Sequence, residues 1–243
     1  MKTRSSLLMF AVAFAAVVMP QQMQAQTYLP QIADGGNWYT AIMINNTSTA
    51  SAIVNLTFFQ DTQSGATIPW NPPFVEVSST NSISVPAGGT VYIHTAGTAT
   101  ALTQGWAQVT KTQASVEVTA IYTYESFAGR PNQDGTSPAT AGGSRILVPF
   151  DATSGYSTGL AIVNPTGGAE PIGVNIELDS GAIPLAPNTM ISLPSNGQRA
   201  FNLTDFFPAA AGHRGQIEFV SDGTIAVAAF RINPTVALTS IPV

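Results

Sequence analysis

The stretch YLPQIADGGNWYTAIMINNTS at residues 28–48 recurs in altered form as LVPFDATSGYSTGLAIVNPTG at residues 147–167. At a constant offset of 119 residues the two stretches share five identical positions: Pro30 with Pro149, Ala33 with Ala152, Gly36 with Gly155, Asn45 with Asn164 and Thr47 with Thr166. Further similar blocks follow in the same order: 54–58 with 174–178, 85–93 with 193–201, 105–109 with 215–219 and 116–122 with 225–231. Preserved order over most of the chain indicates an internal duplication.

Each copy is predicted to be a string of short strands. Ile172, Val174 and Ile176 alternate with polar residues or glycine, the pattern of a strand with one buried face. Gly, Pro and Asn supply frequent turns, and residues 26–243 contain no sustained helical period. The sequence therefore predicts an all-β fold of two tandem antiparallel, immunoglobulin-like β-sandwich repeats at 26–125 and 145–243.

A Gly-, Pro- and Ser-rich segment at 126–144 is predicted to be an exposed linker between the repeats. Three Pro-containing segments, 28–31, 147–150 and 240–243, are predicted to be edge strands, because proline cannot donate to a central ladder. The run IAVAAF at 225–230 is apolar on both faces. One face must fill the core, and the other either packs on the first repeat or another chain, or is a surface of small residues.

The N-terminal segment 1–25 reads as a secretory signal peptide. Lys2 and Arg4 precede an apolar run of 13 residues, Leu7 to Met19, and the expected cleavage follows Ala25. The expected location is extracellular, periplasmic or cell-surface, with no transmembrane anchor in the mature chain. With no cysteine, the fold cannot be disulfide-stapled and must rest on its core.

Removal of the predicted signal peptide would leave six basic and 13 acidic residues. Such a chain lacks the basic surface that nucleic acids require, so no nucleic-acid partner is expected.

The sequence GYSTG at 155–159 fits the G-x-S-x-G nucleophile elbow of serine hydrolases, and Asp205 and His213 follow in the order those enzymes use. The elbow requires a helix after Ser157, whereas GLAIVNPTG alternates like a strand and ends at Asn-Pro. The aligned position in the first copy is Trp38. The motif is therefore interpreted as a strand entry, with the hydrolase as the weakest alternative and no catalytic residue expected.

No metal or cofactor site is predicted. His94 and His213 stand apart, no cysteine exists, and the D-x-D-x-D-G calcium loop is absent. Calcium binding remains an alternative only if loop carboxylates converge: Asp34 with Asn37, Asp151 with Asp134, and Asp179 with Asp222.

Three aromatic residues are candidates for a sugar-binding strip. Trp106 aligns with polar Gln216, so it is expected to point outward; Tyr92 alternates outward, and Trp70 lies in a predicted loop. Exposed flat rings can stack on the apolar face of a pyranose. The alternative is that these rings pack over neighbouring strands or an interface.

Several blocks resemble a tandem extracellular module that recurs in secreted bacterial proteins: YLPQIADGGNWYT, LTQGWAQV, VPFDATSGYSTGLAIVNP, HRGQIEFVSD and FRINPTVALTSIPV. The resemblance covers essentially all of 26–243. It implies secretion and a pair of β-sandwiches, and it is silent on activity and on catalytic residues.

The leading hypothesis is a secreted, non-enzymatic structural or adhesive protein of the cell surface or extracellular matrix. Its expected partners are the cell surface, matrix, polysaccharide, or further copies joined through edge strands. The alternative is a carbohydrate-binding module that uses Trp106, Tyr92 or Trp70.

Overall fold

A computed structural model describes residues 26–125, 132–182, 189–235 and 237–243, so the predicted signal peptide lies outside the described residues. Within these ranges the chain is almost entirely antiparallel strands, with one four-residue helix and one 3-10 turn. The all-β prediction is confirmed. The described residues contain no helix of the length and apolarity needed to cross a membrane.

The first half of the chain forms two sheets. Its strands are β1 (Gln26–Asp34), β2 (Trp38–Asn46), β3 (Ala52–Asp61), β4 (Thr67–Trp70), β5 (Ile83–Val85), β6 (Thr90–His94), β7 (Thr103–Lys111), β8 (Val116–Tyr124) and β9 (Gln133–Pro138). One sheet has the order β1-β7-β3-β4, with β5 also paired to β3, and the other has the order β6-β2-β8-β9. A buried cluster that includes Leu56 of β3 and Ile42 of β2 lies between the two sheets.

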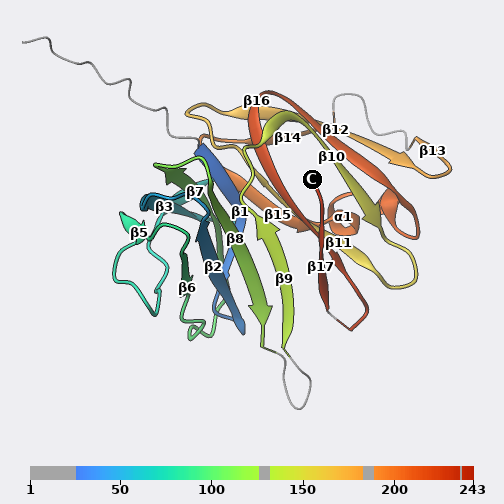
Figure 1. Cartoon of the computed structure of the whole chain (residues 1–243). Coiled ribbons are helices and arrows are strands. Elements are labelled where there is room, and N and C mark those ends of the chain that lie inside the picture. The colour runs from blue at the N-terminus through green and yellow to red at the C-terminus, as the bar shows by residue number, and fades with distance from the viewer. Residues whose placement is uncertain (1–25, 126–131, 183–188, 236) are drawn as a thin grey trace, which may run out of the picture.

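The second half repeats this order of strand pairing. Its elements are β10 (Gly143–Asp151), β11 (Ser157–Val163), β12 (Glu170–Leu178), β13 (Gly181–Ala182), β14 (Met190–Leu193), β15 (Gln198–Asn202), α1 (Leu203–Phe206), the 3-10 turn η1 (Pro208–Ala210), β16 (Arg214–Ile232) and β17 (Leu238–Ile241). The long strand β16 pairs with β10 and β12 along its first part and with β11 and β17 along its second (Figure 1). It therefore occupies the places that β7 and β8 share in the first half.

The predicted alternation correctly locates the second core. Ile172, Val174 and Ile176 are buried in a cluster that also receives Leu160 of β11 and Phe219 of β16. The residues between these core positions, Gly173 and Asn175, are partly or fully exposed. The physical cause is the two-residue period of a strand, which sends successive side chains to opposite faces.

The constant offset of 119 residues fails after a β-bulge in β1. Leu29 pairs with Ala107 and Ile32 with Gly105, so Pro30 and Gln31 together lie opposite the single residue Trp106. The corresponding part of β10 pairs without such an irregularity between Val148 and Asp151. One extra residue in β1 reduces the offset to 118 in β2, which follows the bulge.

Two asparagines show the corrected register. The amide nitrogen of Asn46 donates to the carbonyl oxygens of Ala50, Val85 and Pro86. The amide nitrogen of Asn164 donates to the equivalent carbonyl oxygens of Gly168, Leu193 and Pro194. The alignment of Asn45 with Asn164 is therefore wrong by one residue, and Ser157 corresponds to Tyr39 rather than to Trp38.

The predicted linker is partly a strand. Residues 133–138 form β9 on the edge of β8, and Gly143 already begins β10, whereas residues 126–131 lie outside the described ones. Gly135 suits this position because a Cβ there would lie 2.9 Å from the Cβ of Leu238. Composition alone predicts a loop here. It cannot show that Gly135 lets β9 lie close to β17 of the second half.

The predicted edge strands are confirmed. Each of β1, β10 and β17 has a ladder with only one strand of its sheet. The apolar run 225–230 also resolves into two faces. Ile225, Val227 and Ala229 belong to the second core, whereas Ala226 and Phe230 pack against residues of the first half. The run therefore forms part of an interface between the halves.

Candidate functional site

Trp106 is fully buried, so it cannot belong to an exposed sugar-binding strip, and the alternative that its ring packs at an interface is borne out. Its ring stacks on Phe59 with centroids 4.5 Å apart and meets the edge of Tyr28 at 6.2 Å. Its indole N–H donates to the carbonyl oxygen of Asn196 in the second half, at 2.9 Å. The side chain leaves the first core, as alternation predicts, and is then covered by the second half, including Ala226.

Trp70 is half-buried and packs on the first core. Its ring meets Phe58 edge-on with centroids 6.3 Å apart, and Phe58 also contacts Phe74 at 5.4 Å. Trp70 borders a hollow of about 470 Å³ beneath the segment 71–81. This hollow is separate from the surroundings of Trp106.

Tyr92 is exposed, with 47% of its surface accessible, on the face of β6 that points away from the core. Its ring lies 5.9 Å from that of His94, which lies 5.9 Å from Tyr39. The His94 Nδ1 contacts a Glu76 carboxylate oxygen at 2.5 Å. Burial, followed by repulsion from Tyr39, Glu76 and Asp134, raises the pKa of Tyr92. We call Tyr39, Tyr92 and His94 the tyrosine face.

The three predicted aromatics therefore do not form one strip. Trp106 lies in the junction between the halves, Trp70 beside the segment 71–81, and Tyr92 on the tyrosine face. Only Tyr92 is exposed as the prediction required.

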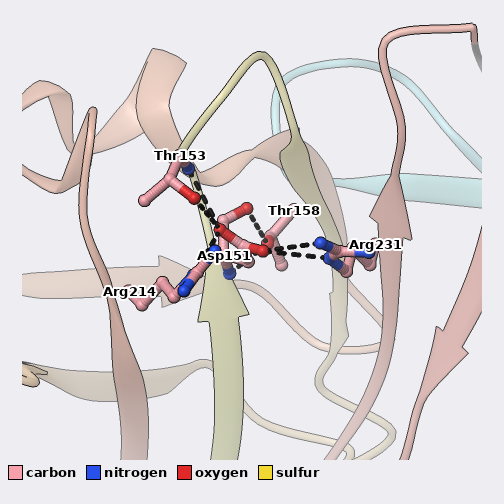
Figure 2. A network of polar contacts seen from close by, with 5 residues as sticks. All are labelled: Asp151, Thr153, Thr158, Arg214 and Arg231. Carbon is pink, nitrogen blue, oxygen red and sulfur yellow. Dashed lines mark hydrogen bonds and ion pairs between the residues drawn. The ribbon is translucent and has the colours of Figure 1, made fainter.

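A polar network centred on Asp151 joins both ends of β16 to β10 (Figure 2). The Asp151 carboxylate accepts hydrogen bonds from Arg231 at 2.7 Å, Arg214 at 3.2 Å and the Thr153 hydroxyl at 2.7 Å. Its backbone N–H donates to the hydroxyl of Thr158 on β11, at 3.2 Å. The network thus ties β10 to β11 and to both ends of β16.

The charge of Asp151 is stabilised by these donors. Burial opposes ionisation, but the bonds from Thr153, Arg231 and Arg214 outweigh it and hold the pKa of Asp151 well below its usual range. The Arg231 guanidinium also lies 3.5 Å from the centre of the Tyr156 ring. With its acceptor positions occupied in this way, Asp151 acts as a structural clamp.

The motif GYSTG is the entry to a strand, as predicted. Gly155 has a φ of 79°, the left-handed turn conformation that glycine tolerates, and Ser157 is the first residue of β11. A nucleophile elbow needs a helix directly after the serine, and β11 continues to Val163. Asp205 accepts from Asn202 at 3.1 Å, while His213 lies in the turn before β16.

The described residues contain no group of three or more His, Cys, Asp or Glu side chains close enough to hold a metal ion. Of the carboxylates considered for calcium, Asp34 accepts from the Gly97 N–H at 2.8 Å and Asp151 is held by arginines.

A cleft of about 290 Å³ lies between the two halves. The first half contributes Gln31, Trp38 and Gln104, and the second contributes Phe201, Asn202 and Phe230, among other residues. We call this the junction cleft. Sequence reasoning missed it because its walls come from separate copies, and the sole signal was the second apolar face of 225–230.

Comparisons with protein-family models, with curated proteins and with solved structures find no match to this chain. The fold and its surfaces define an all-β protein with two similarly connected halves and a ligand-sized cleft where they meet.

Proposed function

We propose that this chain is a secreted, non-enzymatic structural or adhesive protein of the cell surface or extracellular matrix, built from two immunoglobulin-like β-sandwich copies. The leader-like N-terminus and low charge support secretion. The shared order of strand pairing in the two halves, with Asn46 and Asn164 in matching networks, supports the duplication.

The observation that carries the proposal is the junction between the halves. Trp106 and Gln198 are both fully buried there, and Gln198 donates to the carbonyl oxygens of Pro30 and Gly105 at 2.6 and 2.9 Å. Buried apolar contacts and hydrogen bonds between two halves restrict their relative motion. A rigid block with broad strand surfaces suits a scaffold or adhesive role.

The test is surface association of the purified protein. The chain has no cysteine, so Gly168→Cys, at a position where an added Cβ meets open space, allows labelling at one site. We expect the labelled protein to bind the insoluble envelope or matrix fraction of its producing cells, or to self-associate in sedimentation. A strictly monomeric protein that stays in the supernatant contradicts the proposal.

A second candidate is polysaccharide binding on the tyrosine face, favoured by the exposure of Tyr92 beside Tyr39 and His94. Tyr92→Ala should abolish retention on insoluble polysaccharide, whereas Trp70→Ala, at a half-buried ring, should retain it. Equal retention of wild type and Tyr92→Ala rejects this candidate.

The proposal that the protein is not a serine hydrolase has a separate test. A fluorophosphonate probe should leave Ser157 unlabelled, because the residue lies in a strand and not at a strand–helix elbow. Labelling that disappears in Ser157→Ala would overturn it.

A further inference from the structure

Three glutamine side chains form a directional chain that ends in the junction cleft. The Gln198 amide nitrogen donates to the main-chain oxygens of Pro30 and Gly105, which fixes which side of this amide is nitrogen. The same nitrogen lies 3.1 Å from Gln31 Oε1. Gln31 Nε2 in turn donates to Gln104 Oε1 at 2.8 Å.

This direction leaves a hydrogen-bond donor at the end of the chain. Gln104 accepts through its oxygen, so its NH₂ group points onward, and no described residue accepts from it. Amide groups linked in one direction polarise one another, which strengthens the terminal donor. The junction cleft therefore has a pre-oriented donor on its first-half wall.

The opposite wall provides an acceptor. The Asn202 nitrogen donates to Asp205 Oδ2 at 3.1 Å, which leaves Asn202 Oδ1 for another partner. This oxygen lies 3.9 Å from the position that a Gly159 Cβ would occupy, and Gly159 also lines the cleft. A hydroxyl group both donates and accepts, so hydroxyl groups match the two walls together.

Apart from Gln31 and Tyr122, the rest of the lining is apolar, and none of it is charged. Partly exposed rings of Trp38, Phe201 and Phe230 border the cleft, and none of its lining residues is Asp, Glu, Lys, Arg or His. Binding sites combine such apolar walls with a few placed polar groups. A charged ligand would lose hydration here without gaining a counter-charge.

We propose that the junction cleft binds the end of a neutral saccharide, with hydroxyl groups between Gln104 and Asn202 and the apolar sugar face against the rings. The volume of about 290 Å³ lies at the lower end of ligand pockets and suits one or two sugar rings rather than a long chain. The site shares no residue with the tyrosine face and goes beyond the structural role. Sugar binding in the junction cleft can therefore be disproved without disproving the structural role or polysaccharide binding on the tyrosine face.

The test is titration calorimetry of the full mature chain with glucose, galactose, mannose and N-acetylglucosamine, and with glucuronic acid as the charged counterpart. At least one neutral sugar should bind, and glucuronic acid should bind more weakly than glucose. Gln104→Leu should weaken binding about tenfold, the effect of one lost hydrogen bond. Gln108→Leu, on the same strand but outside the cleft lining, should bind like wild type.

Asn202→Ala provides a second variant at an exposed position, so that the test survives if Gln104→Leu does not fold. It should also weaken binding about tenfold. The proposal is overturned if no neutral sugar binds, if glucuronic acid binds as tightly as glucose, or if folded cleft variants bind like wild type.

Discussion

At the scale of single residues, the buried amide of Gln198 is the hydrogen-bond donor that the bulge in β1 requires. The bulge residues Pro30 and Gln31 present carbonyl oxygens away from the regular ladder register. Gln198 donates to the Pro30 oxygen, and the Tyr122 hydroxyl donates to the Gln31 oxygen at 2.8 Å. Buried carbonyls need such partners, because an unpaired one costs the free energy of its lost hydration.

Gln198→Leu tests this dependence. The substitution leaves the buried carbonyls of Pro30 and Gly105 without their amide donor, so the free energy of unfolding should fall by about 2 kcal/mol. Urea denaturation measures the change. Gln108→Leu removes a partly exposed amide of β7 and should leave stability within about 0.5 kcal/mol of wild type.

Asp151 gives a pH-dependent prediction. Its folded-state pKa is lowered, so its stabilisation is fully present above the unfolded pKa of about 4 and is lost as pH falls through the folded pKa. Asp151→Asn should lower the free energy of unfolding by about 1 kcal/mol at neutral pH. The difference from wild type should narrow steadily below about pH 4.

The measurement is urea denaturation of both proteins across this pH range. Asp134→Asn, at an exposed position of β9, is the control and should have nearly the stability of wild type. A constant gap between Asp151→Asn and wild type down to about pH 2 would show that the charge of Asp151 is not responsible.

At the scale of elements, β16 continues from its ladders with β10 and β12 into its ladder with β11 without a break in strand structure. Glu170 of β12 supports this corner, because its carboxylate accepts from the Ser221 hydroxyl and from the Gly223 N–H at 2.6 Å. Those bonds lower the pKa of Glu170. In the first half the same passage between β7 and β8 is made by the turn at 112–115.

Glu170→Ala should loosen the corner. Removing the acceptor should accelerate hydrogen exchange of the Gly223 amide and lower the free energy of unfolding by about 1 kcal/mol. Exchange measured by NMR reports the local effect. Glu177→Ala, on the exposed side of the same strand, should leave that amide unchanged.

Strands with a clear alternating pattern could be predicted from sequence. Strands that form because they pack against distant parts of the chain could not. β3 and β12 followed from the spacing of Val54, Leu56, Ile172 and Val174. Composition predicts a linker where β9 lies, because Gly135 and Ser137 carry no apolar signal, although both are buried in the structure. The bulge was missed because one inserted residue hardly alters the similarity between the copies.

At the scale of the whole molecule, the junction should make the two halves unfold together. All three tryptophans, Trp38, Trp70 and Trp106, belong to the first half, so their fluorescence reports on that half and, through Trp106, on the junction. Circular dichroism reports on strands of both halves. Wild-type transitions followed by the two signals should coincide. Separate midpoints in wild type would show that the halves are energetically independent.

Trp106→Ala should weaken that coupling. The change leaves a cavity between Phe59, Tyr28 and the second half and should cost about 3–5 kcal/mol. The two midpoints should then separate, because the lost contacts belong to both halves. Trp70→Ala, whose contacts lie within the first half, should destabilise without separating them in the same way.

The sequence by itself determined the strands with a clear alternating pattern, their buried faces, the edge positions and the order in which the similar blocks recur. These depend on local chemistry: two-residue alternation, turn residues and the missing N–H of proline. Only the tertiary structure decided that Trp106 is covered and that Gln198, Gln31 and Gln104 form one chain into a cleft. Gln198 and Gln31 are 167 positions apart, and their contact depends on how two separately patterned units dock, which no local pattern encodes.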